Sequence, residues 1–99
     1  MDAQRSVSAK HWTKEEVSRL IREIIVDLAP APGDTVPDAR LVEDLGYNSL
    51  SLLELAFSLE DEFELRAIDE ETARKIRTVG DVERHVLAEL ASSGQLIVL

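Results

Sequence analysis

The first helical segment of the chain is marked at both ends, and it limits the possible folds more than any other feature. Residues 13–16, TKEE, match a capping box, in which the Thr13 and Glu16 side chains each accept a backbone N–H group that the first turn leaves free. Apolar residues then recur every three or four positions along one helical face: Val17, Leu20, Ile21, Ile24, Ile25 and Leu28. Pro30 and Pro32 end the helix, because a residue before proline avoids the helical backbone region. Such a wide apolar face must be covered by other elements of the chain.

Capping residues and apolar spacing predict two further main helices and one short helix. Asn48 is a good N-cap for a helix over residues 49–64. Asp69 can cap a short helix over residues 70–75, and Thr78 can cap the last helix. The inner positions of that last helix are expected to be Val79, Val82, Val86 and Leu90. The sequence therefore predicts an all-α fold, a small bundle of three main helices plus one short helix.

The segments outside these helices divide the chain. Residues 33–47 form a long first loop, with a tight turn expected at Gly46, and a loop of this length in a small domain is often functional. Its apolar residues are expected to pack on the body: Val36, Leu41, Val42 and Leu45. Residues 1–12 are expected to be a flexible N-terminal arm, residues 13–92 the folded domain, and residues 93–99 a C-terminal tail. The apolar end of that tail either packs back on the bundle or extends from it.

The composition excludes several classes of site. The 99 residues suffice for one domain, and the absence of cysteine excludes disulfides, thiolate metal sites and a cysteine nucleophile. His11 and His85 have no metal-ligand spacing and are expected to be surface residues, while Trp12 is expected to pack against Glu16 and Val17. No catalytic group of side chains can be named, so an enzyme is not expected. No apolar run reaches the ~18 residues of a membrane span, and the start does not resemble a secretory signal, so we expect a cytoplasmic protein. We also expect it to be a monomer.

The net charge of −9 lies in the middle of the chain. Residues 43–71 hold ten acidic residues and one basic residue, Arg66, whereas the remainder holds ten of each. A phosphate backbone would be repelled by this segment, so nucleic acid is not an expected partner. The charge fits either a basic patch on another protein or a solvated acidic face kept for solubility.

The helix expected over residues 49–64 has more apolar residues than one face can use. At about 100° per residue, one stripe forms a core-facing side: Leu52, Leu55, Ala56, Leu59 and Phe63. A second stripe contains Leu50, Leu53 and Phe57, interleaved with Glu54, Glu60 and Asp61. We name these six residues the docking stripe. Burying carboxylates without partners is costly, which favours an exposed surface that binds a basic partner over a helix packed on two sides.

The same region carries a family resemblance. The segment from Gly46 to Leu50, GYNSL, precedes an acidic helix that ends in LEDEF at residues 59–63. This arrangement resembles the acyl carrier proteins, whose signature is a Gly-x-Asp-Ser-Leu segment that opens an acidic helix. The acidic residues 69–71 and the segment IRTVGDV at residues 76–82 match as well. The resemblance spans roughly residues 14–91.

The resemblance implies a function and a cofactor. A phosphopantetheinyl transferase would transfer 4′-phosphopantetheine from coenzyme A to Ser49, and the thiol of that arm would carry acyl intermediates as thioesters. The protein would itself perform no chemistry. Its other partners would be ketosynthase-type enzymes with basic patches, which would contact Asn48 and the docking stripe. The acyl chain is expected in an apolar pocket lined by Leu45, Leu55, Leu59, Phe63, Ile76 and Val86.

The sequence departs from the family pattern at Asn48, where the family has Asp. Asn caps a helix about as well as Asp, but the charge that a transferase can recognise is lost. The nearby Ser51 and Ser58 are expected to face solvent. Met1 and the short chain indicate a discrete carrier, and the unusual ends favour polyketide or related specialised biosynthesis over a housekeeping fatty-acid carrier. The alternatives are an aminoacyl or peptidyl carrier and an unmodified acidic helical adaptor that has kept the fold.

Overall fold

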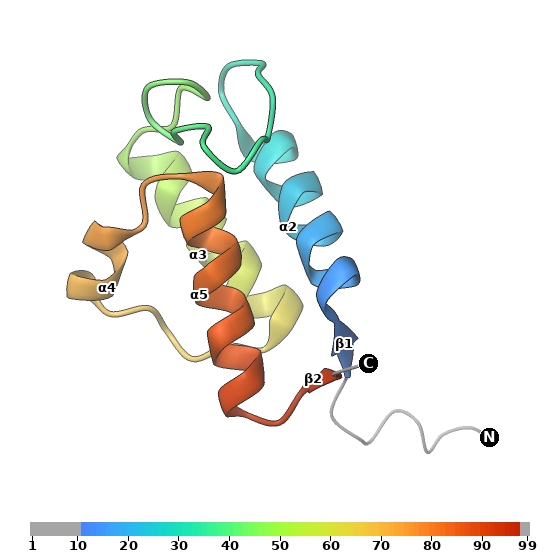
Figure 1. Cartoon of the computed structure of the whole chain (residues 1–99). Helices are drawn as coiled ribbons and strands as arrows, with labels where there is room; N and C mark the ends of the chain where they lie inside the picture. The colour runs from blue at the N-terminus through green and yellow to red at the C-terminus, as the bar shows by residue number, and fades with distance from the viewer. Residues whose placement is uncertain (1–10, 98–99) are drawn as a thin grey trace.

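The computed structural model describes residues 11–97, and most of them belong to four helices (Figure 1). The elements are, in chain order, β1 (Trp12–Thr13), α2 (Lys14–Leu28), α3 (Ser49–Phe63), α4 (Glu70–Lys75), α5 (Val79–Ser92) and β2 (Leu96–Ile97). Helices α2, α3 and α5 pack together, and the short α4 lies in the connection between α3 and α5. The predicted bundle of three main helices plus one short helix is confirmed, with a small sheet added to it.

Each predicted N-cap is present at the start of its helix. The Thr13 hydroxyl accepts the Glu16 N–H at 3.2 Å, and the Glu16 carboxylate accepts the Thr13 N–H at 3.0 Å. Thr78 forms the same reciprocal pair at the start of α5. Asp69 accepts the backbone N–H of the third residue of α4 at 2.7 Å, and this hydrogen bond lowers the pKa of Asp69. Local sequence therefore determines where these helices begin.

The core lies between the three long helices and takes its side chains from one stripe of each. The buried residues of α2 are Val17, Ile21 and Ile25, and those of α5 include all four predicted inner positions. Helix α3 contributes Leu55, Leu59 and Phe63. The apolar periodicity of the sequence thus predicts the buried face of every main helix.

The long first loop is fastened to the start of α5. Arg40 and Thr78 form an isolated antiparallel bridge, and the Leu41 N–H donates to the Arg77 carbonyl at 2.9 Å. Leu41 and Leu45 are buried as predicted, whereas the prediction is wrong for Val36 and Val42, which are more than half exposed. The loop therefore packs through only two of its four apolar residues.

Two contacts fasten the end of this loop to the C-terminal part of α2 and the residues that follow it. Gly46 has a φ of +75°, which favours glycine, and a Cβ there would lie 2.9 Å from the Ala31 Cβ. Tyr47 is buried, and its hydroxyl donates to the Ile25 carbonyl at 2.7 Å. This carbonyl belongs to the last turn of α2, where carbonyls lack helical partners. Burial raises the pKa of Tyr47 to about 12.

The two ends of the described chain meet in a parallel two-stranded sheet. Trp12 pairs with Leu96 and Thr13 with Ile97, and the Trp12 N–H donates to the Gln95 carbonyl at 2.9 Å. Of the two alternatives for the tail, packing back on the bundle is therefore observed for Leu96, and the backbone of residue 97 pairs with β1. The rest of the predicted arm and tail, residues 1–10 and 98–99, lies outside the described residues.

The role of Trp12 differs from the prediction. Its ring meets Phe63 edge to face, with centroids 4.9 Å apart and an interplanar angle of 63°. Trp12 thus joins strand β1 to the C-terminal end of α3, rather than only holding the start of α2. The hydrophobic spacing of the helices could not indicate this contact, because it depends on how the bundle is assembled.

Candidate functional site

Ser49 is the first residue of α3, and it is exposed. The loop contacts of Leu41, Leu45 and Tyr47 fix the chain that leads to it, so the serine stands at the junction of a fastened loop and a rigid helix. No acidic side chain lies in the first turn of α3. The positive end of the α3 dipole is therefore not neutralised by a carboxylate in this turn.

The N-cap of α3 is reciprocal, and one of its two residues, Ser51, was predicted to face solvent. The Asn48 side-chain oxygen accepts the Ser51 N–H at 3.0 Å, and the Ser51 hydroxyl accepts the Asn48 N–H at 2.8 Å. Ser51 is buried, so the prediction of a solvent-facing side chain is wrong. Ser58 is half-buried, which also differs from that prediction. Of the three serines on α3, only Ser49 is exposed.

The backbone beside Ser49 can bind an anionic group. Among the described residues, the N–H groups of Ser49 and Leu50 have no protein acceptor, because the Asn48 cap occupies only the Ser51 N–H. Free N–H groups at the positive end of a helix favour a phosphate. A phosphodiester on the Ser49 hydroxyl would lie next to both N–H groups.

The two stripes of α3 are confirmed by exposure. Leu55, Leu59 and Phe63 have exposed fractions of 3%, 3% and 1%. Leu50, Leu53 and Phe57 have exposed fractions of 66%, 50% and 59%. The alternative of a helix packed on two sides is therefore wrong. Three large apolar side chains therefore lie on one exposed helical face that begins one residue after Ser49.

The acids of the docking stripe differ in their surroundings. Glu54 and Asp61 are exposed, while Glu60 is half-buried. One Glu60 carboxylate oxygen accepts the Ile68 N–H at 3.3 Å, across the connection between α3 and α4. Glu60 therefore helps to hold this connection, and only Glu54 and Asp61 are fully available to a partner.

A small apolar cavity of about 120 Å³ lies between α3 and the α4–α5 region. Leu55, Leu59 and Ile76 of the predicted acyl pocket line it. Leu45, Phe63 and Val86, the other residues predicted to line an acyl pocket, are buried in the core and do not line this cavity. The lining residues that the sequence did not indicate are Leu41, Leu52, Ala56, Ile68, Ala73, Val82 and His85. Ile68 and Ala73 belong to α4 and the connection before it, which have no strong apolar periodicity.

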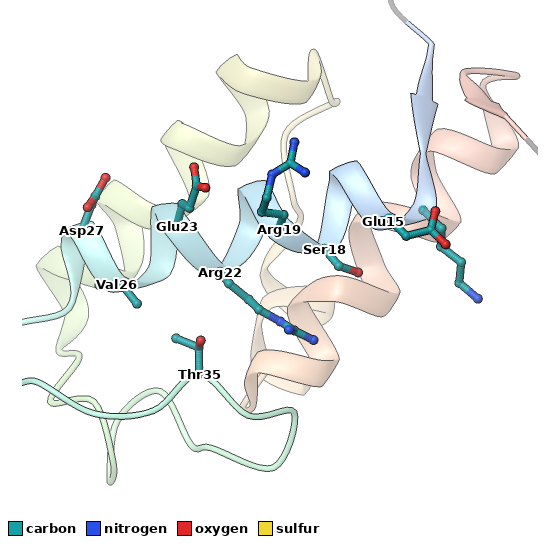
Figure 2. Close-up of a pocket in the computed structure, with 9 residues that line it drawn as sticks. Glu15, Ser18, Arg19, Arg22, Glu23, Val26, Asp27 and Thr35 are labelled. Atoms are coloured by element: carbon teal, nitrogen blue, oxygen red, sulfur yellow. The ribbon is translucent and has the colours of Figure 1, made fainter.

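A larger hollow of about 870 Å³ runs along the outer side of α2 (Figure 2). Its walls are mostly charged or polar side chains, among them Arg19, Arg22, Glu23 and Asp27, with Val26 as the apolar member. The hollow does not include Ser49 and has no evident part in a site built on that residue.

The comparisons with known proteins agree with this geometry. The family model for the phosphopantetheine attachment site matches residues 19–86, more than half of the chain. A protein of Mycobacterium tuberculosis assigned as an acyl carrier protein has a similar structure, with 34% sequence identity and a TM-score of 0.62 over 78% of this chain and 97% of that one. The chain belongs to the acyl carrier protein family.

Two further carriers extend the comparison. An acyl carrier protein of Thermotoga maritima is 30% identical, with a TM-score of 0.65 over 81% of this carrier and 93% of its own chain. The acetyl actinorhodin acyl carrier protein of Streptomyces coelicolor is 27% identical, with a TM-score of 0.59 over 77% of this carrier and 92% of its own chain. Both likenesses cover the helical bundle as a whole.

Membership of this family defines the protein as a carrier and not as an enzyme, with 4′-phosphopantetheine as its covalent cofactor. The start of α3 fits this group, because it offers an exposed hydroxyl and two free N–H groups. Among residues 11–97, no group of His, Cys, Asp or Glu side chains could hold a metal ion. None of the helices in that range is both long and apolar enough to cross a membrane.

Proposed function

We propose that Ser49 is the residue that carries 4′-phosphopantetheine and that the protein holds acyl groups for fatty-acid or polyketide-type biosynthesis. The observation that carries the proposal is the placement of Ser49 as the exposed first residue of α3, inside the matched residues 19–86. The competing serines of the helix, Ser51 and Ser58, are buried and half-buried.

The chain's own residues supply position and charge for the arm. Asn48 caps α3 and leaves the Ser49 and Leu50 N–H groups free to bind the phosphodiester. When attached, the cofactor supplies a thiol that holds an acyl group as a thioester. The apolar cavity between the helices gives part of that acyl group a place away from water.

The partners fit the exposed side of α3. Leu50, Leu53 and Phe57 supply apolar contact area next to the attachment site, and Glu54 and Asp61 supply negative charge. A phosphopantetheinyl transferase and ketosynthase-type enzymes with basic patches would bind this surface. Asn48 lies at its edge and would contact the same partners.

Polyketide biosynthesis is the favoured setting. One similar carrier is named for actinorhodin and bears an acetyl group. The negative charge of the docking stripe favours acyl over aminoacyl or peptidyl carriage, because it suits basic docking patches.

The proposal is tested by incubation with coenzyme A, Mg²⁺ and a broad-specificity phosphopantetheinyl transferase, followed by intact mass measurement. The wild-type protein should gain one phosphopantetheine, and Ser49→Ala should gain none. An unmodified wild-type protein would instead support the alternative of an acidic adaptor that has kept the fold.

A further inference from the structure

His85 occupies an unexpected position on α5. It was predicted to be a surface residue, but it is half-buried and lines the apolar cavity. The other nine lining residues are Leu41, Leu52, Leu55, Ala56, Leu59, Ile68, Ala73, Ile76 and Val82. The cavity therefore has one polar side chain in an otherwise hydrocarbon wall.

His85 also borders a second, polar hollow. Ile68 also lines both the cavity and this hollow. The other residues that line the hollow are Arg66, Ala67, Asp69, Thr72 and Glu89. Arg66 and Glu89, which both line that hollow, form an ion pair at 3.6 Å. The imidazole thus stands at the boundary between a charged hollow and an apolar cavity.

The cavity is within reach of the attachment site and is small. Leu52 and Leu55 lie three and six residues after Ser49, or about 5 and 9 Å along the axis of α3. Its volume of about 120 Å³ is somewhat less than the ~150 Å³ cavity that holds benzene. It can therefore take roughly five non-hydrogen atoms, which indicates a short acyl group or the end of a longer one.

The chemistry of the wall selects among short acyl groups. A water molecule needs two to four polar partners to occupy a cavity, and this lining offers one. A saturated chain would cover the part of the imidazole that lines the cavity without providing a hydrogen bond, which is unfavourable. A chain with a carbonyl or hydroxyl oxygen would provide one, because an imidazole has both a donor and an acceptor nitrogen.

We propose that His85 is a specificity-determining residue that favours short acyl groups bearing an oxygen along the chain, such as 3-oxoacyl groups, over saturated ones. This inference rests on the proposed function of Ser49 as the attachment residue. It identifies the class of cargo by the one polar side chain in the cavity wall. The reactions that supply such a cargo are condensations that leave a ketone in the chain.

The test compares two acyl groups of equal length on one protein. A phosphopantetheinyl transferase loads Ser49 from pentanoyl-coenzyme A or from 3-oxopentanoyl-coenzyme A, and intact mass measurement verifies each product. Thermal unfolding then gives the melting temperature of both loaded forms for the wild type, His85→Leu, His85→Gln and the control His11→Leu. The difference between the two loaded forms of one variant cancels any general effect of the substitution on folding.

In the wild type and in His11→Leu, the 3-oxopentanoyl form should melt at least about 4 °C above the pentanoyl form, the shift expected for one net hydrogen bond in a domain of this size. In His85→Leu the difference should vanish or reverse, and His85→Gln should retain part of it. Nuclear Overhauser contacts should connect the chain to the methyl groups of Leu55 and Ile76.

Two results would overturn the inference alone. One is an equal melting temperature for both loaded wild-type forms, and the other is an undiminished difference in His85→Leu. A failure of Ser49 to become loaded would overturn the proposed function, and this inference with it. The mass measurement separates that outcome from the other two.

Discussion

Asn48 shows how one residue can serve the fold and alter recognition. Its side chain and that of Ser51 cap α3 reciprocally, a role that Asp would fill equally well. Asp at this position would add a negative charge beside Ser49 without changing the hydrogen bonds. We therefore expect the departure from the family pattern to affect the transferase and not the stability of the carrier.

We expect Asn48→Asp to leave the free energy of unfolding within about 0.5 kcal/mol of the wild type and to speed arm attachment. Asn48→Ala should cost about 1 kcal/mol, because it removes the cap. Urea unfolding and initial rates with one transferase measure the two effects. Equal initial rates for the wild type and the Asn48→Asp variant would show that the missing carboxylate is irrelevant to that enzyme.

Tyr47 provides a pH test of the loop contact. Burial raises its pKa to about 12 from an ordinary value of 10.0, so the folded state favours the neutral phenol. The resulting stability is present in full below pH 10 and is lost as the pH rises toward 12. Tyr47→Phe should cost about 1–3 kcal/mol at pH 7, since the Ile25 carbonyl loses its partner.

The stability difference between the wild type and Tyr47→Phe should shrink between pH 10 and about 12. Chemical denaturation at several pH values measures it, and Tyr47 is the one tyrosine of the chain. A difference that stays constant over this range would mean that the phenol is not held in its neutral form by the fold.

At the scale of the elements, the sequence predicted what local interactions determine. Thr13, Asp69 and Thr78 begin their helices as expected, because a cap acts within one turn. The reciprocal part of the Asn48–Ser51 cap was missed, since Ser is not the usual acidic or amide residue at that position. Tyr47 and His85 were missed for another reason: neither lies in a periodic pattern that predicts burial.

The strands could not be predicted from local sequence either. Each has two residues, and they pair across almost the whole length of the chain. Nothing in a two-residue segment favours a strand without its partner. The candidate site was predictable in its serine and its exposed stripe, which follow from a motif and from helical geometry. The lining of the cavity was predicted only in part, because Ile68 and Ala73 of the α4 region contribute to it and no sequence pattern indicates their position.

The two stripes of α3 should respond differently to truncation. Phe57→Ala should cost less than about 1 kcal/mol, because the side chain is 59% exposed. Leu59→Ala should cost about 2–5 kcal/mol, because Leu59 is buried. Binding to the transferase should weaken with Phe57→Ala and stay unchanged with folded Leu59→Ala. Equal destabilisation by the two substitutions would contradict the assignment of the second stripe to a partner surface.

The charge of the docking stripe is best tested at Glu54 and Asp61, which are exposed. The double substitution Glu54→Lys with Asp61→Lys should slow association with the transferase and flatten its dependence on salt, since steering acts mainly on the on-rate. Glu60→Gln is the matched control, because it keeps an oxygen for the Ile68 N–H. A slower on-rate in that variant alone would place the steering charge at Glu60 and contradict its assignment to Glu54 and Asp61.

At the scale of the whole molecule, the small sheet and the start of α3 lie at opposite ends of the bundle (Figure 1). Trp12 contacts Phe63, the last residue of α3, and Ser49 is the first. The 15 residues of that helix span about 22 Å. The sheet can therefore stabilise the bundle without contact with partners that bind at Ser49.

Truncation after Gly94 removes β2 and the Gln95 carbonyl that accepts the Trp12 N–H. It should lower the melting temperature by at least about 4 °C, the shift for ~1 kcal/mol in a domain of this size. The initial rate of arm attachment at a temperature where both proteins are folded should not change. Removal of residues 98–99 alone is the control, since it retains both strands. An attachment rate that falls with the sheet would contradict the independence of the two ends.

The most direct test of the account is the location of the arm on the modified protein. Trypsin releases residues 41–66 as one peptide, which contains Ser49, Ser51 and Ser58. Fragmentation of this peptide after treatment with coenzyme A and transferase should place the whole added mass on Ser49. Ser51→Ala and Ser58→Ala should still be modified, although Ser51→Ala loses part of a cap. Added mass on Ser51 or Ser58, or modification that survives Ser49→Ala, would contradict the account.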